Sequence, residues 1–123
     1  MSRRRSKGEQ EILTYFKNNN ISFKEEVSFP GLVTRKNNPL RFDFLIEPNI
    51  LIEIQGQHHY APVNKYPRAK RVHNTTIYHD QLKKEFCKNN NYFLIEIGYK
   101  YFKDIQTILP DLLDQIKKYD TNT

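Results

Sequence analysis

Two acidic residues stand at mirrored positions around a predicted turn. Asp43 and Glu53 are each five residues from Pro48, inside segments rich in apolar, β-branched and aromatic residues. If these segments form a hairpin centred on Pro48, the carboxylates face each other with Cβ atoms about 4.5–5.5 Å apart. Carboxylates that close repel unless a positive group lies between them, and Mg²⁺ meets that need. Such a metal activates water and stabilises charge on a phosphodiester. The alternative is that both acids are solvated or pair with Arg41 and a lysine.

Other polar residues near this pair can take part in the same chemistry. Gln55 is two residues after Glu53 and therefore on the same face of the strand. His58 and His59 follow the end of that strand, where a histidine can act as general acid, general base or ligand, or can simply be exposed. Zinc is not expected, because the four histidines and Cys87 lack a standard zinc-ligand spacing. Cys87 is expected in the core.

The charge of the chain is positive and unevenly spread. The 123 residues carry a net charge of +6, and no acid lies between Glu53 and Asp80. That gap holds Lys65, Arg68, Lys70 and Arg71, and a second basic cluster opens the chain with Arg3, Arg4, Arg5 and Lys7. Two such clusters favour a surface that contacts phosphates, although a solvated loop and a frayed terminus would have the same composition.

Length and composition restrict the class of protein. One domain with one core fits this length, and 16 aromatic residues supply the bulk to fill it. A single cysteine excludes an internal disulfide framework and favours a reducing, intracellular compartment, which we take to be the cytoplasm of a bacterial cell or of a virus-infected host. The sequence shows no signal peptide and no apolar run long enough to cross a membrane.

In the first half of the chain, the pattern predicts a helix, a strand and a hairpin. Ser6 and Glu9 have capping-box spacing before a helix over residues 6–19. Alternating apolar residues predict a strand over 21–29, ended by a turn at Pro30-Gly31. Residues 40–47 and 50–55 form the hairpin, and both of its faces are partly apolar, so we expect the sheet to be covered on each side.

In the second half, residues 56–75 contain two prolines and no clear periodicity, which predicts a long basic loop. A helix over 76–89 follows, and Asp80 near its start has the position of an acid favoured by the helix dipole. A strand over 92–97 leads to a last helix that Asp104 caps and Pro110 breaks or kinks, with a frayed tail at 120–123. The predicted order is α-β-β-β-α-β-α, an α/β or α+β sandwich with one central sheet.

At this point several motifs together resemble the PD-(D/E)XK nuclease superfamily. The resemblance is carried by Phe42-Asp43-Phe44, by the I-E-x-x-G-x-x-H-Y pattern of residues 52–60, by the D-x-x-K of Asp80 to Lys83, and by Leu94-Ile95-Glu96-Ile97. The branch most similar to this chain contains the very-short-patch repair endonuclease and the phage-type EDxHD endonucleases. The resemblance covers residues 7 to about 99 and implies a restriction-endonuclease-like αβββαβ core with a central mixed sheet flanked by helices.

The same resemblance implies roles for individual residues. Asp43 would be the central metal ligand, and Glu9 the acid of the first helix, able to cap that helix and still reach the metal. Glu53 and Gln55 would belong to the E-x-x triplet, His59 would be the EDxHD histidine, and Asp80 the final aspartate. Gln55 stands where the superfamily has a lysine and cannot act as a base, so His59 or Lys83 would have to activate water or stabilise the leaving group. Phe42 replaces the proline of the "PD" dipeptide.

These observations predict a Mg²⁺-dependent DNA endonuclease, with Mn²⁺ as a substitute ion. The metal would be bound by Asp43 and Glu53, with Glu9 as a further ligand. The basic residues would hold backbone phosphates, a role independent of sequence. One alternative is a structure-selective resolvase of Holliday junctions or flaps. A second, suggested by Gln55, is a catalytically weak or silent DNA-binding module of a larger complex. A homodimer would allow both strands to be cut.

Overall fold

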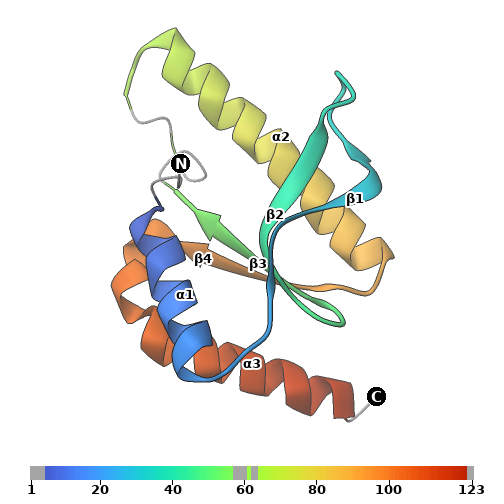
Figure 1. Cartoon of the computed structure of the whole chain (residues 1–123). Coiled ribbons are helices and arrows are strands. Elements are labelled where there is room, and N and C mark those ends of the chain that lie inside the picture. The colour runs from blue at the N-terminus through green and yellow to red at the C-terminus, as the bar shows by residue number, and fades with distance from the viewer. Residues whose placement is uncertain (1–4, 57–60, 62–63, 122–123) are drawn as a thin grey trace.

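The computed structural model places helices on both sides of one sheet (Figure 1). The structure describes residues 5–56, 61 and 64–121. Along the described chain the elements are α1 (Lys7–Asn18), β1 (Lys24–Val33), β2 (Pro39–Ile46), β3 (Ile50–Gln55), α2 (Pro67–Asn89), β4 (Phe93–Gly98), the 3₁₀ helix η2 (Tyr99–Asp104) and α3 (Ile105–Thr121). This order confirms the predicted α-β-β-β-α-β-α succession. Within the described residues, no helix is both long and apolar enough to span a membrane.

The sheet is mixed, with strand order β1-β2-β3-β4. β1 pairs antiparallel with β2, and β2 antiparallel with β3, whereas β4 runs parallel to β3. Two parallel neighbours need a long crossover, and α2 supplies it. In the β2–β3 hairpin the pairs Phe44–Ile52, Leu45–Leu51 and Ile46–Ile50 are symmetric about Pro48, so the predicted centre of the hairpin is confirmed.

Each face of the sheet buries its own apolar cluster. On one face, α1 and α3 cover a cluster made of Ile12, Phe16, Phe44, Ile52, Ile95, Ile97, Ile105 and Leu109. On the other face, Cys87 of α2 packs with Leu32, Leu40, Phe42, Leu45 and Leu51. The prediction that the sheet is covered on both sides, with Cys87 in the core, is therefore confirmed. The chain is an α/β protein.

In the first half of the chain, one predicted boundary is confirmed and another is wrong. The first helix is confirmed, and the Ser6 side chain accepts a hydrogen bond from the Glu9 backbone N–H at 3.2 Å. The turn at Pro30-Gly31 is wrong, because β1 continues through these residues to Val33. The ladder with β2 shifts register between Ser28 and Val33, and Gly31 has a φ of +86°. β1 is an edge strand, where a proline and an irregular glycine are tolerated.

The largest correction concerns the predicted loop over residues 56–75. Its second part is helical, because α2 begins at Pro67 and runs for 23 residues. Proline is favoured in the first turn of a helix, where its missing N–H has no partner to lose. Arg68, Lys70 and Arg71 therefore belong to the first two turns of α2. Asp80 lies in the middle of the helix rather than at its start, so its predicted position beside the helix dipole is wrong.

The C-terminal predictions also change. Asp104 ends a 3₁₀ helix that continues directly into α3, rather than capping it from a loop. α3 does not end at Pro110 but extends to Thr121, so Asp120 and Thr121 are helical and not part of a frayed tail. Ile105 and Leu109 are fully buried on α3, and this burial outweighs the hydrogen bond that the proline removes.

Candidate functional site

The sheet is irregular at Asp43. The β1–β2 pairs Glu25–Phe44 and Val27–Phe42 keep one register, but Glu26 between them has a φ of +50°. Phe42 packs in the cluster under α2, whereas Phe44 packs in the cluster under α1 and α3. Residues two apart on a regular strand lie on the same face, so the alternation of β2 is interrupted at Asp43. This interruption directs the Asp43 carboxylate toward β3.

Side chains replace the backbone ladder between Asp43 and Glu53. The Ile54 backbone N–H donates to Asp43 Oδ2 at 2.7 Å, and the Asp43 backbone N–H donates to Glu53 Oε1 at 3.1 Å. The two carboxylates are therefore neighbours across β2 and β3, as the symmetry about Pro48 predicted. Each carboxylate is fixed by a backbone donor of the facing strand.

Glu53 is the most buried acid of the site, with 6% of the residue exposed. Its second oxygen, Oε2, accepts a hydrogen bond from Lys83 Nζ at 3.0 Å. Burial and the nearby Asp43 raise the pKa of Glu53 to about 7, against the opposing effect of the Lys83 ammonium. Because the pKa stays raised despite Lys83, the Lys83 ammonium offsets only part of the cost of ionising Glu53. A further positive charge near Glu53 would therefore be favourable. Lys83 also lies 5.4 Å from the centroid of the Phe42 ring.

A third carboxylate, Glu96, lies in the same row and was not predicted as a site residue. Glu96 of β4 is the register partner of Glu53, so Asp43, Glu53 and Glu96 occupy adjacent positions on three neighbouring strands. The Gln55 amide donates from Nε2 to Glu96 Oε2, and Lys84 Nζ lies 3.6 Å from Glu96 Oε1. Lysines of α2 therefore pair with two of the three acids. An acid between Ile95 and Ile97 in an otherwise apolar strand was the available signal.

α2 brings further titratable groups to this face of the sheet. Asp80 lies one turn before Lys83 and so on the same side of the helix. Partial burial and the charge of Lys83 lower the pKa of His79, and Asp80 opposes that shift. Lys83 reaches the carboxylate row from α2, and Asp80 lies on the same side of that helix, while His58 and His59 lie outside the described residues.

Glu9 sits at the start of α1, near the end of β3. A Cβ placed on Gly8 would lie 3.0 Å from Ile54 Cγ2, which shows how closely this end of α1 approaches the strand that carries Glu53. The Glu9 carboxylate has Arg5 as an ionic partner at 3.6 Å. Among the residues that the structure describes, no three His, Cys, Asp or Glu side chains are grouped closely enough to hold a metal ion.

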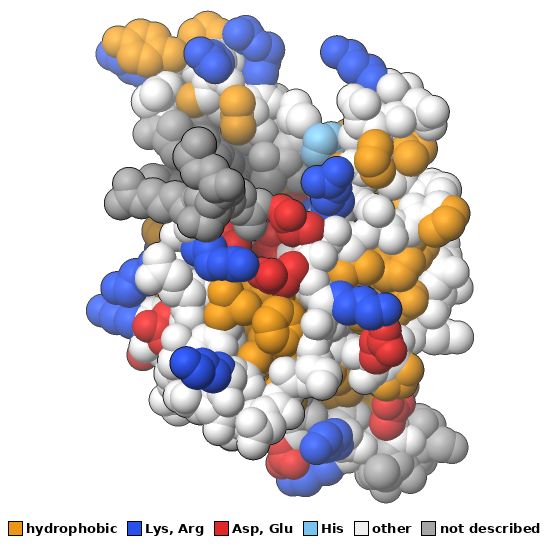
Figure 2. Space-filling view, viewed as in Figure 1, with side chains coloured by type: hydrophobic (Ala, Val, Ile, Leu, Met, Phe, Trp, Pro, Cys, Tyr) orange, Lys and Arg blue, Asp and Glu red, His pale blue; other side chains and the backbone are white. Residues whose placement is uncertain are grey.

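The predicted phosphate-binding residues fall into three sets. Arg3 and Arg4 lie outside the described residues. Arg5 bonds to Glu25 as well as to Glu9, and Lys7 is the exposed first residue of α1. The remaining four are exposed at or before the start of α2: Lys65, Arg68, Lys70 and Arg71. Figure 2 shows acidic side chains gathered in the middle of one face, with basic side chains around them.

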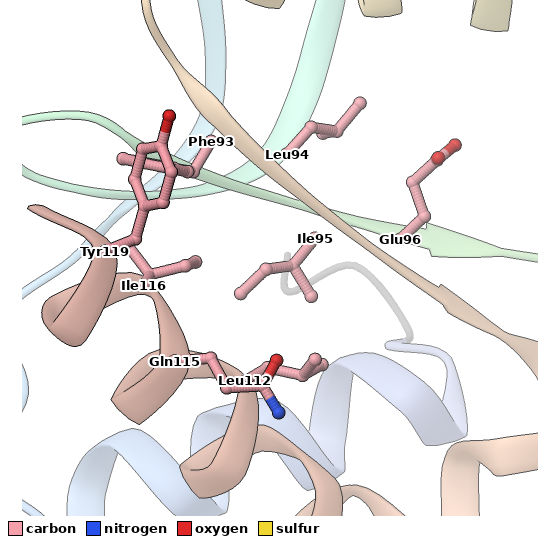
Figure 3. Close-up of a pocket in the computed structure, with 8 residues that line it drawn as sticks. All are labelled: Phe93, Leu94, Ile95, Glu96, Leu112, Gln115, Ile116 and Tyr119. Carbon is pink, nitrogen blue, oxygen red and sulfur yellow. The ribbon is translucent and has the colours of Figure 1, made fainter.

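An apolar groove of about 420 Å³ lies elsewhere, between β4 and α3. Figure 3 shows Ile95 directed toward Leu112 of α3, whereas Leu94 and Glu96 point to the other side of β4. Of the carboxylate row, only Glu96 lines this groove, and it does so at the margin. The groove is therefore separate from the Asp43–Glu53 pair.

Comparison with known proteins gives one partial relative. Protein 307L of Invertebrate iridescent virus 6, described as uncharacterized, is 36% identical over 58 residues, which make up 47% of this chain. The match covers 29% of the length of that viral protein, less than a third. No family model matches the chain. No solved structure matches it.

Proposed function

We propose that the chain is a metal-dependent DNA endonuclease with a restriction-endonuclease-like core. The observation that supports this proposal best is the pair of carboxylates, Asp43 and Glu53, each held by a backbone N–H of the facing strand. Glu53 is buried and Asp43 is half-buried, and two such acids side by side favour a cation between them. On a chain with a net charge of +6, metal-assisted hydrolysis of a nucleic-acid phosphodiester explains both features.

The residues present fit a hard divalent ion. Mg²⁺ commonly takes one or two protein carboxylates and completes its octahedron with water and phosphate oxygens. Asp43 and Glu53 would hold it, whereas Glu9, at the neighbouring end of α1, is not grouped with them closely enough in this structure to share the ion as the resemblance implied. A Mg²⁺ ion bound there would activate water and stabilise charge on the scissile phosphate. A two-carboxylate site agrees with the lack of a larger ligand group within the described chain.

Lys83 is the group that compensates for Gln55. Gln55 carries no charge, and its amide is engaged with Glu96. The Lys83 ammonium reaches the same site from α2 and contacts Glu53 directly. In the proposed enzyme it stabilises negative charge on the phosphate. His59 would act as general base or acid, and Asp80 would orient it. The basic residues at the start of α2 would hold backbone phosphates.

A cleavage assay tests the proposal with variants that keep the local hydrogen bonds. Asp43→Asn retains an oxygen for the Ile54 N–H, and Glu53→Gln retains one for the Asp43 N–H, so the fold should survive both changes. We expect wild type to cut DNA with Mg²⁺ or Mn²⁺ but not with EDTA, and both variants to lose cutting while keeping DNA binding. Glu85→Gln, which removes an exposed acid of α2, is the control and should cut normally.

A measurement that does not depend on activity is the effect of Mg²⁺ on thermal unfolding. An ion that binds only the folded state raises Tm, and the rise caused by Mg²⁺ should disappear in Asp43→Asn. Linear duplex, branched and single-stranded substrates in the same assay separate a general endonuclease from a structure-selective resolvase. Cutting that survives both substitutions would refute the assigned site.

The replacement of the superfamily lysine by Gln55 favours a second candidate, a DNA-binding module without activity. Lys83 already pairs with Glu53, which provides charge compensation without a metal. This candidate predicts tight DNA binding, no cleavage with any divalent ion, and no change of Tm on adding Mg²⁺.

A further inference from the structure

The excess positive charge of the chain comes from two stretches of sequence that contain no acid. Residues 27–42 hold three cations and residues 54–79 hold four, whereas the rest of the chain has 13 cations and 14 acids. The first stretch spans the connection between β1 and β2, and the second includes the N-terminal half of α2. In Figure 1 the β1–β2 connection and the N-terminal half of α2 lie at the same end of the molecule.

Arg35 and Tyr78 join these two stretches in space. The guanidinium carbon of Arg35, in the β1–β2 connection, lies 4.8 Å from the centroid of the Tyr78 ring in α2. Arg35 and Lys36 occupy the centre of a tight turn. This turn is closed by two backbone hydrogen bonds of 2.9 Å, from Asn37 N–H to the Thr34 oxygen and from Thr34 N–H to the Asn38 oxygen. The backbone of the turn and the Arg35 side chain are therefore held in place, which reduces the conformational entropy lost on binding.

The ring of Tyr78 continues a row of arginines along α2. Arg68 and Arg71 precede Tyr78 by ten and seven residues, which puts all three side chains on one side of the helix. About 10 Å of helix separates Arg71 from Tyr78, and about 7.5 Å separates Tyr78 from Lys83 at the carboxylate row. We call Arg35, Lys36, Arg68 and Arg71 the arginine surface. It lies on the N-terminal side of Lys83, on a different side of α2 from the one that contacts Glu53.

The chemistry of this surface fits a phosphate backbone. A guanidinium is a planar fork that binds two phosphate oxygens at once. All four residues are exposed, and within the described chain none of the ion pairs uses them. Tyr66, the N-cap residue of α2, is 63% exposed and offers a ring on which a base can stack.

We propose that the arginine surface binds the backbone phosphates of DNA, with the Arg35–Lys36 turn acting as a second arm opposite the start of α2. This inference rests on the proposed function for the identity of the nucleic acid, and it extends that function by assigning the β1–β2 turn and Tyr78 to substrate binding. Tyr78 is a positioning residue, because it holds Arg35 and does not itself contact phosphate.

The test measures binding of a fluorescent duplex by anisotropy in EDTA over a range of KCl concentrations. The double variant Arg35→Ala/Lys36→Ala should bind about tenfold more weakly, and the slope of log K against log salt should become shallower by about 1.8, since each phosphate contact contributes about 0.9. The matched control is Lys117→Ala/Lys118→Ala, which removes two charges from the C-terminal end of α3 and should change neither quantity. Arg35→Lys and Tyr78→Leu should fall between wild type and the double variant.

The outcomes separate this inference from the proposed function. Equal binding by wild type and Arg35→Ala/Lys36→Ala, or an equal loss in the α3 control, overturns the inference even if wild type cuts DNA. Specific loss in the turn variant, with a wild type that binds but never cuts, supports the inference and refutes the endonuclease. The substituted arginines and lysines are all exposed, so the fold should survive their replacement. Circular dichroism of each variant checks that it does.

Discussion

From the raised pKa of Glu53 we predict how the free energy of unfolding changes with pH. In the folded chain its pKa is raised to about 7 by burial and by Asp43, whereas an ordinary glutamate has a value of 4.5. Between these values the folded chain holds one more proton than the unfolded chain. The free energy of unfolding therefore falls as pH rises from about 4.5 to about 7, and it levels off above that range, where both states are ionised. At 1.36 kcal/mol for each pKa unit, the loss is about 3 kcal/mol.

Glu53→Gln isolates this contribution, because the amide has no proton to exchange. We expect the stability difference between wild type and Glu53→Gln to change by about 3 kcal/mol between pH 4 and pH 8, in the direction that disfavours wild type at high pH.

Urea unfolding followed by circular dichroism at several pH values measures the effect. Glu85→Gln controls for the loss of one negative charge from an exposed site on α2. Repeating the series with Mg²⁺ should shrink the wild-type pH dependence, because an ion bound between the carboxylates favours their ionised forms. If wild type and Glu53→Gln show the same pH profile, the buried, proton-binding Glu53 described above is refuted.

Two further predictions concern neighbouring contacts. Lys83→Met removes the ammonium that lowers the pKa of Glu53, so that pKa should rise further above 7 in a carboxyl NMR titration; an unchanged or lower value would contradict the Lys83–Glu53 contact. Gly8→Ala should destabilise the fold by about 1–3 kcal/mol in urea unfolding, because the new methyl group would lie 2.9 Å from Phe102 and 3.0 Å from Ile54. A more stable variant, as helix propensity alone would give, would show that α1 can move away from β3.

Local patterns predicted several elements well because short-range physics decides them. The Ser6–Glu9 cap and the alternation of β3 depend only on neighbouring residues. Patterns failed where a contact distant in sequence compensates for a local penalty. β1 continues through Pro30 because pairing with β2 holds it, and α3 continues through Pro110 because Ile105 and Leu109 are buried. The length of α2 was underestimated because Pro67 by itself indicates a loop. A proline is favourable in a helix only in the first turn, which is where Pro67 lies.

By itself the sequence determined that Asp43 and Glu53 meet, since a hairpin symmetric about Pro48 leaves no other register for residues at equal distance from it. It also determined the excess of positive charge and the order of the elements. Only the tertiary structure decided what surrounds the pair: Lys83 on Glu53, Glu96 beside it in β4, and Arg35 on the ring of Tyr78. These partners are 30 to 43 residues apart in sequence, and only the parallel β3–α2–β4 crossover and the packing of α2 on the sheet bring them together.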